Sequence, residues 1–174
     1  MGDKLTGKVA AITGGTAGIG LGIASAFVDE GASVALMARN PEKGAKALSL
    51  LDVGERAIFI SGDAMVQSEV EGFLDETIAQ LGKVDILVNN AGGAGDLQPM
   101  VDLSDEAFDE AMKWNVYATF WGMRRVLKPM LEQSWGRIIN ISSTEGKVGK
   151  PVMSAYATAK HAINGMTKSV AQEV

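Results

Sequence analysis

The residues that decide the fold are Lys8-Val-Ala-Ala-Ile-Thr-Gly-Gly-Thr-Ala-Gly-Ile-Gly20, in which a short apolar run leads into a cluster of glycines. Residues 8–13 predict a buried strand, and the residues from Gly18 to Glu30 predict a helix. Glycines at such a turn let the backbone approach a pyrophosphate, while the helix N-terminus offers free N–H groups and the positive end of its dipole. The alternative is a turn that needs glycine only for tight packing. The position between a strand and a helix favours nucleotide binding.

The alternation of strand and helix continues along the chain. Further strands are predicted at residues 33–38, 56–61, 84–89 and 137–141, and further helices at 41–51, 67–81, from 104 past 129, and at 154–174. Pro41 opens a helix, Gly82 closes one, Ser104 is an N-cap, and Pro129 is expected to kink or end the long helix near its last turn. Such alternation predicts the α/β class, with a doubly wound parallel sheet in a single domain over residues 1–174.

The composition excludes several kinds of function. A net charge of −5 argues against a nucleic-acid partner, which needs a basic surface. The absence of cysteine excludes disulfides, thiolate catalysis and zinc–thiolate sites, and the single histidine, His161, excludes a multi-histidine metal site within one chain. The N-terminus has no secretory apolar core, and no stretch approaches transmembrane length. We therefore expect a cytoplasmic protein with no metal site and no membrane partner.

A second candidate site lies in Ser142-Ser-Thr-Glu-Gly-Lys-Val-Gly-Lys-Pro-Val-Met-Ser-Ala-Tyr-Ala-Thr-Ala-Lys160. Tyr156 and Lys160 are four residues apart and would share one face of a helix. A nearby ammonium lowers the pKa of a phenol, so the pair could exchange protons near neutral pH. A serine hydroxyl close by could hold a carbonyl oxygen as charge develops on it. The alternative is an ordinary helix with a surface lysine and a half-buried tyrosine.

Five motifs occur in order along the chain: residues 13–20, Asn89-Asn-Ala-Gly92, Asn115, Ser143 and Tyr156-Ala-Thr-Ala-Lys160. Together they resemble the short-chain dehydrogenase/reductase family, from about Leu5 onward. The resemblance implies strand order 3-2-1-4-5 and hydride transfer between a nicotinamide and a carbonyl or secondary-alcohol carbon. It implies that Tyr156 exchanges a proton with the substrate oxygen and that Lys160 lowers the pKa of Tyr156 and holds the nicotinamide ribose. Ser143, preferred to Ser142 for its spacing from Tyr156, would position the substrate oxygen, and Asn115 would support a proton relay.

The resemblance also implies the cofactor contacts. These fall on Gly14, Thr16, Gly18, Ile19, Gly20, Arg39, Asp63, Ala64, Asn90, Ala91, Gly92, Tyr156 and Lys160. The stretch Met37-Ala-Arg-Asn40 lacks the acid expected to bind a ribose, and Arg39 could instead pair with a 2′-phosphate. We therefore predict NADP as the cofactor, with NAD as the alternative. A solvated loop arginine is the competing interpretation, and Ala17 stands where many NADP-preferring relatives carry a second basic residue.

The printed sequence ends at Val174, within the helix that carries Lys160, whereas relatives continue into a sixth and a seventh strand. We therefore expect an incomplete domain with an open edge at the fifth strand. The expected partner is a small carbonyl or alcohol substrate. A 3-oxoacyl thioester is the first candidate, and a hydroxysteroid, a hydroxy acid or another secondary alcohol is the alternative. The remaining alternative is a truncated, non-catalytic nucleotide-binding fragment. Relatives pair the two long helices across a two-fold axis, which implies a homodimer or homotetramer.

Overall fold

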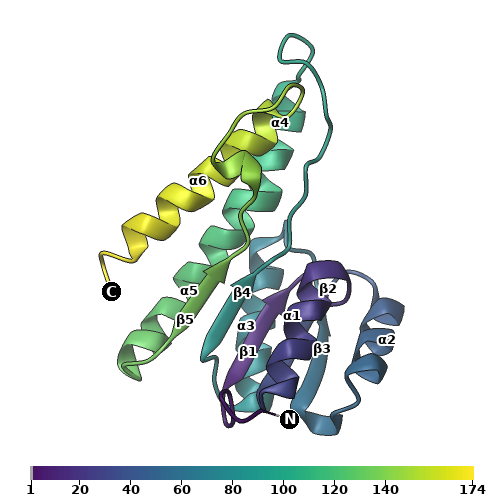
Figure 1. Ribbon diagram of the computed structural model, residues 1–174, viewed down its shortest axis with the longest axis vertical. Helices are drawn as coiled ribbons and strands as arrows, with labels where there is room; N and C mark the ends of the chain where they lie inside the picture. The colour runs from purple at the N-terminus through teal and green to yellow at the C-terminus, as the bar shows by residue number, and fades with distance from the viewer. Residues whose placement is uncertain (1) are drawn as a thin grey trace.

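A computed structural model describes residues 2–174 and shows a parallel five-stranded sheet with helices on both faces (Figure 1). The strand order is β3-β2-β1-β4-β5, which confirms the predicted α/β class and the predicted order. The strands are β1 (Val9–Thr13), β2 (Ser33–Ala38), β3 (Ala57–Ser61), β4 (Ile86–Asn89) and β5 (Arg137–Asn140). The helices are α1 (Gly18–Asp29), α2 (Pro41–Leu51), α3 (Gln67–Leu81), α4 (Asp105–Met112), α5 (Ala118–Glu132) and α6 (Ser154–Val170).

The helix ends follow from local chemistry. Asn40 caps α2 by accepting a hydrogen bond from the Lys43 N–H at 3.0 Å, with Pro41 at the first helical position. Gly82 ends α3 at a left-handed φ of 86°, and its N–H donates to the Ile78 carbonyl. Ser104 caps α4 by accepting from the Ala107 N–H at 3.1 Å. The sequence predicted each of these boundaries because each depends on neighbouring residues alone.

The long helix predicted from Ser104 is interrupted, which corrects the sequence prediction. Residues Lys113–Tyr117 form a π-helical turn between α4 and α5, in which the Ala118 N–H donates to the Lys113 carbonyl five residues back. Beyond it, Pro129 lies inside α5, which ends shortly afterwards at Glu132. The π turn carries Asn115, whose side chain bonds outside its own helix, and turns of this kind are frequent at functional sites.

Alternate residues of each strand face two different helical layers. On one face, Ile12 and Leu36 pack with Val28 of α1 and Ala47 of α2. On the other face, Met37 and its neighbours pack with α3 and α5, in a cluster that contains Val70, Phe73, Leu74, Trp121, Val126 and Met130. Because β1 is buried along its whole length, it forms the centre of this three-layer core.

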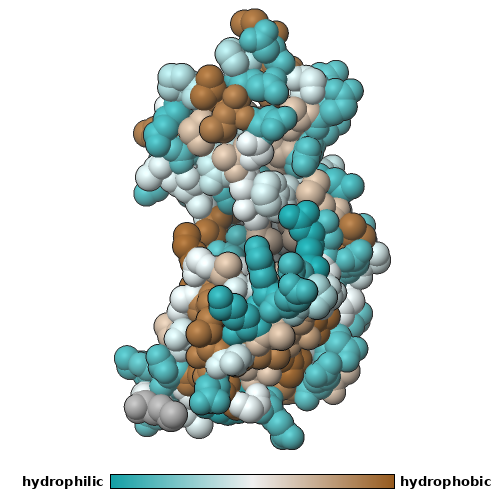
Figure 2. Space-filling view, turned by 90° about the vertical axis from the view of Figure 1, so that its right-hand side faces the viewer, coloured by the Kyte–Doolittle hydropathy of each residue, from teal (hydrophilic) through white to brown (hydrophobic). Residues whose placement is uncertain are grey.

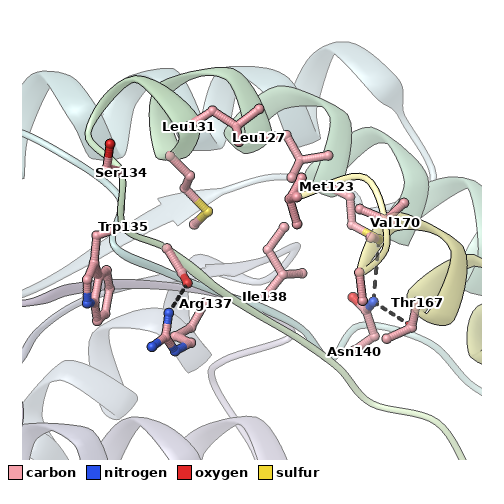
Figure 3. A pocket seen from close by; sticks show the side chains of 14 residues that line it. Met123, Leu127, Leu131, Ser134, Trp135, Arg137, Ile138, Asn140, Thr167 and Val170 are labelled. Atoms are coloured by element: carbon pink, nitrogen blue, oxygen red, sulfur yellow. Dashed lines mark hydrogen bonds between the residues drawn. The ribbon is translucent and has the colours of Figure 1, made fainter.

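The far edge of the sheet is open within residues 2–174. Strand β5 pairs with β4 alone, and its residues alternate between exposed and half-buried, with Ile139 at 40% exposure. Figure 3 shows the apolar groove of about 560 Å³ that lies between β5, α5 and α6, with Met123, Leu127, Ile138 and Val170 among the side chains that line it. No helix within residues 2–174 has the length and apolarity needed to cross a membrane.

Candidate active site

Two turns at the carboxyl edge of the sheet are joined by hydrogen bonds. Thr13 ends β1, and its hydroxyl oxygen accepts from the backbone N–H groups of Asn90 and Ala91, each at 3.1 Å. In return, the Asn90 amide Nδ2 donates to the carbonyls of Thr13 and Gly14, each at 3.0 Å. The glycine turn after β1 and the turn after β4 therefore form one rigid unit where a doubly wound sheet binds its ligand.

The glycines of the first turn meet real spatial constraints. Gly14 adopts a φ of +65°, which favours glycine. A Cβ at Gly20 would lie 2.3 Å from the Gly14 carbonyl oxygen, so only glycine lets α1 approach the strand this closely. Ala17, at the N-cap of α1, has no side-chain group that could cap the first N–H groups of the helix. These N–H groups suit a phosphate, and the exposed Gly18 and Ile19 lie at the same helix end.

A cleft of about 230 Å³ extends from this edge over the ends of β2, β3 and β4. It is lined by Gly14, Met37, Ala38, Arg39, Gly62, Asp63, Ala64, Asn90, Ala91, Gly92 and Trp114. Seven of these residues were predicted cofactor contacts, and the structure brings them together from four separate loops. Thr16, Gly18, Ile19 and Gly20 are not part of the cleft lining; they belong to the turn and helix end beside it.

Arg39 lies at the mouth of this cleft, with its side chain 71% exposed. One guanidinium nitrogen is 3.8 Å from a carboxylate oxygen of Asp63, an ion pair across the ends of β2 and β3. The other Asp63 oxygen accepts from the Met65 N–H at 2.9 Å. Because an exposed ion pair is weakly held, an anionic ligand could compete for the guanidinium.

Asn115 is fully buried beside the turn after β4. Its Nδ2 donates to the carbonyls of Gly93 at 3.0 Å and Ala111 at 2.9 Å, and its Oδ1 accepts from the Gly93 N–H at 3.3 Å. A Cβ at Gly92 would lie 2.6 Å from Asn115 Oδ1 and 3.5 Å from Lys160 Nζ. Asn115, Gly92 and Lys160 therefore meet at one point, although they lie far apart in the sequence.

Lys160 is a buried cation, 4% exposed, and no carboxylate within residues 2–174 pairs with it. Its Nζ donates to the Ile141 carbonyl at 2.9 Å and lies 5.5 Å from the centre of the Tyr156 ring. Burial lowers the pKa of Lys160 from 10.5 to about 8. A buried lysine without a partner acid costs stability, so this arrangement is typical of a functional site.

The two candidate serines have different neighbours. The Ser142 hydroxyl donates to the Lys160 backbone carbonyl at 3.4 Å, so it faces α6. The Ser143 hydroxyl instead bonds to Glu145, in the short turn Thr144–Gly146 that follows β5. These contacts distinguish the two serines but do not decide between them, and the choice of Ser143 stays a prediction from its spacing to Tyr156.

Two residues beside the site escaped the sequence interpretation. The indole of Trp114 lines the cleft and lies against Gly93, where a Cβ would be 2.5 Å from the ring. Glu145 is only 5% exposed. Neither feature has a local signal, because the contact of Trp114 with Gly93 and the burial of Glu145 depend on distant parts of the chain. Within residues 2–174, no cluster of acids or histidines could hold a metal ion.

Comparisons with known proteins agree with this geometry. The family described as "short chain dehydrogenase" matches residues 8–174. The chain is 38% identical to L-fucose dehydrogenase of Oryctolagus cuniculus over 170 residues, which is 98% of this chain and 58% of that protein. It is 38% identical to the NADP-dependent (R)-specific alcohol dehydrogenase of Lentilactobacillus kefiri over 172 residues, 98% of this chain and 68% of the relative.

Among solved structures, NAD⁺-bound xylitol dehydrogenase superimposes with a TM-score of 0.92 at 34% identity. The superposition covers 98% of this chain and 66% of that structure. The chain therefore spans between 58% and 68% of the relatives described here, and the matched part includes the whole site.

Proposed function

Because the chain belongs to the short chain dehydrogenase family, we propose that this protein is an NAD(P)-dependent oxidoreductase that interconverts a secondary alcohol and its carbonyl compound. The observation that carries the proposal is the buried Lys160, which lies 5.5 Å from the Tyr156 ring without a partner acid. A cation so placed can stabilise the negative charge that develops on the Tyr156 oxygen while a proton is transferred.

Each residue of the site has a defined task in this proposal. The bound nicotinamide supplies or accepts the hydride. Tyr156 gives a proton to the substrate oxygen in reduction and takes it in oxidation, and Ser143 binds the same oxygen. Lys160 stabilises the charge that develops on Tyr156 and holds the nicotinamide ribose, while Asn115 fixes the backbone of Gly93 beside them.

The cofactor we propose is NADP, with NAD as the alternative. The turn after β1 fits a pyrophosphate, because Gly20 allows close approach and α1 presents its uncapped N-terminus. Arg39 is exposed at the cleft and held only by Asp63 at 3.8 Å, so its guanidinium can turn to a 2′-phosphate. The named relatives include both an NADP-dependent enzyme and an NAD⁺-bound one, so family membership alone does not decide between the two cofactors.

The substrate we propose is a small secondary alcohol or ketone with an apolar part. Two loops beside the site expose apolar side chains, Leu97 and Met100 on one and Val148 and Val152 on the other, and the first loop reaches the top of the molecule, where Figure 2 shows hydrophobic atoms. A 3-oxoacyl thioester remains one candidate within this class. The named relatives act on a sugar and on alcohols, which broadens the panel to test. A homodimer or homotetramer and a cytoplasmic location remain predictions.

The experiment that tests this function replaces Tyr156 by Phe. Turnover of ketones and acetoacetyl-CoA with NADPH, and of sugars with NADP⁺, should fall by at least about 10²-fold, the usual contribution of a general acid or base. The affinity for NADPH should change less than about twofold, because the phenol oxygen is not needed to bind the phosphates. Tyr117→Phe is the matched control, since that tyrosine is 51% exposed on the π turn. Full activity in Tyr156→Phe would refute the role, and wild-type binding of NADPH without any turnover would favour a nucleotide-binding fragment.

A further inference from the structure

Glu145 is a buried acid two residues after Ser143. Its side chain is 7% exposed, whereas the side chain of Lys150, its ion-pair partner, is 53% exposed. The turn that carries Glu145 follows β5 and packs against α6, the helix of Tyr156 and Lys160. Burial of an unpaired carboxylate costs free energy, so the partners of Glu145 indicate what keeps it at this position.

Within residues 2–174, both hydrogen bonds of the Ser143 side chain are made to Glu145. The Ser143 oxygen accepts from the Glu145 backbone N–H at 3.3 Å, and the Ser143 hydroxyl donates to the Glu145 carboxylate through a short hydrogen bond. A hydroxyl has one proton to donate. Ser143 can therefore donate to a substrate oxygen only by turning its proton away from Glu145.

The carboxylate can release that proton at little cost. Its Oε2 also accepts from the Thr144 hydroxyl at 2.9 Å, and Oε1 pairs with the Lys150 ammonium. The Lys150 ammonium, with the hydroxyls of Ser143 and Thr144, lowers the pKa of Glu145 to about 2, so the group stays charged at working pH. Two partners remain when Ser143 turns, so the carboxylate is never left unsatisfied.

The turn is also fixed against the catalytic helix. The Asn164 side chain donates to the Gly146 carbonyl at 2.8 Å, and a Cβ at Gly146 would lie 3.0 Å from the Lys160 carbonyl. The turn is thus held on α6 through Gly146, and within the turn Glu145 bonds to Ser143, so Ser143 keeps a constant position relative to that helix. This matters because small displacements of a reacting group cost large factors in rate.

We propose that Glu145 is a positioning residue that fixes the Ser143 hydroxyl and releases it to donate a hydrogen bond to the substrate oxygen as charge develops there, while Lys150 offsets the charge of the carboxylate. The inference rests on the proposed oxidoreductase function. It makes Glu145 act through Ser143 alone, with no direct contact to the cofactor. That restriction makes it testable.

The test is a double-mutant cycle between Ser143 and Glu145, measured as kcat and KM for a ketone with NADPH. Glu145→Ala should lower kcat by about tenfold, a moderate loss of orientation, and leave NADPH affinity within about twofold. In the Ser143→Ala background, the same change should have no further effect on kcat. Glu145→Gln should recover most of the loss, because the amide oxygen still accepts from Ser143. Lys150→Met should lower kcat, whereas Lys147→Met, at an exposed lysine of the same loop, should not.

The outcomes separate this inference from the function on which it rests. Equal losses from Glu145→Ala in both backgrounds, or weaker NADPH binding, would show a merely structural role for the turn and overturn the inference. Failure of Glu145→Gln to recover activity while remaining folded would also contradict it. If the wild-type protein binds NADPH and reduces nothing in the panel, the proposed function fails, and this inference fails with it.

Discussion

Strands β1 and β5 belong to the same parallel sheet but have opposite surroundings. Strand β1 lies between β2 and β4, and all five of its residues are buried. Within residues 2–174, strand β5 pairs only with β4, exposes every second residue, and borders the apolar groove of Figure 3. The two strands nevertheless end at the same edge, where the glycine turn follows β1 and Ser143 follows β5.

This contrast divides the site into two halves. The half that suits a cofactor rests on β1 to β4, whose core is covered by helices on both faces. The half that suits a substrate rests on β5 and α6, whose outer side is uncovered within residues 2–174. Cofactor binding should therefore depend mainly on the first half, to which Lys160 of α6 adds only the contact with the nicotinamide ribose, whereas turnover should depend on both halves.

The largest expected difference between the two halves is in core stability. Leu36→Ala in β2 should reduce the free energy of unfolding by about 2–5 kcal/mol, because this side chain is fully buried. Ile139→Ala in β5 should cost less than about 1 kcal/mol, because that side chain is 40% exposed. Urea unfolding of both variants makes the comparison, and equal losses would contradict the description of β5 as an open edge.

A second, smaller contrast lies within α1. Gly20→Ala should cost about 1–3 kcal/mol and weaken NADPH binding, since its Cβ would lie 2.3 Å from a backbone oxygen. Gly22→Ala, two residues along, meets no atom within 4 Å and should stabilise the helix by about 0.5–1 kcal/mol. Thermal unfolding and NADPH titration of both variants check this pair. If Gly20→Ala changed neither the stability nor the NADPH affinity, α1 would not approach the turn so closely.

The smallest expected effect concerns the pH dependence of stability at the boundary between the halves. The folded chain holds Lys160 at a pKa of about 8, below the usual 10.5, so above pH 8 the unfolded chain binds more protons. Stability therefore rises with pH between those two values. The free-energy cost of burying the charged Lys160 is present at pH 7 and should decrease by about 1 kcal/mol by pH 9. Between pH 7 and pH 9 the free energy of unfolding of wild type should rise by this amount relative to that of Lys160→Met. The free energy of unfolding of Lys168→Met, at an exposed lysine of the same helix, should change with pH as that of wild type does. A pH-independent difference in the free energy of unfolding between wild type and Lys160→Met would contradict the lowered pKa of Lys160.

The sequence predicted those parts of the structure that depend on local patterns. Hydrophobic runs located all five strands to within two residues, and Pro41, Gly82 and Ser104 located helix ends. The π turn at Lys113–Tyr117 was missed, because helical periodicity does not reveal one extra residue in a turn. Within this turn Asn115 bonds to Gly93, 22 residues away in the sequence, a contact that the local pattern does not show.

The site was predicted unevenly for a similar reason. The glycine turn and the spacing of Tyr156 and Lys160 are visible as motifs, whereas the burial of Glu145 results from packing of its turn on α6. The ion pair between Arg39 and Asp63 could have been found, since β2 and β3 were predicted neighbours and both residues follow those strands. Sequence motifs therefore locate residues on the same helix or turn, and the predicted strand order locates residues at the same edge of the sheet.

The most direct test of this account is a titration of the chain with NADPH and with NADH, followed by nicotinamide fluorescence at fixed ionic strength. The account predicts that NADPH binds more tightly, that Arg39→Ala removes the preference, and that Ile139→Ala binds as wild type does. This result would show that the half built on β1 to β4 carries the main cofactor contacts and does not need a covered β5 edge. Binding of neither nucleotide would contradict the account, because the turns after β1 and β4 would then not be a cofactor site.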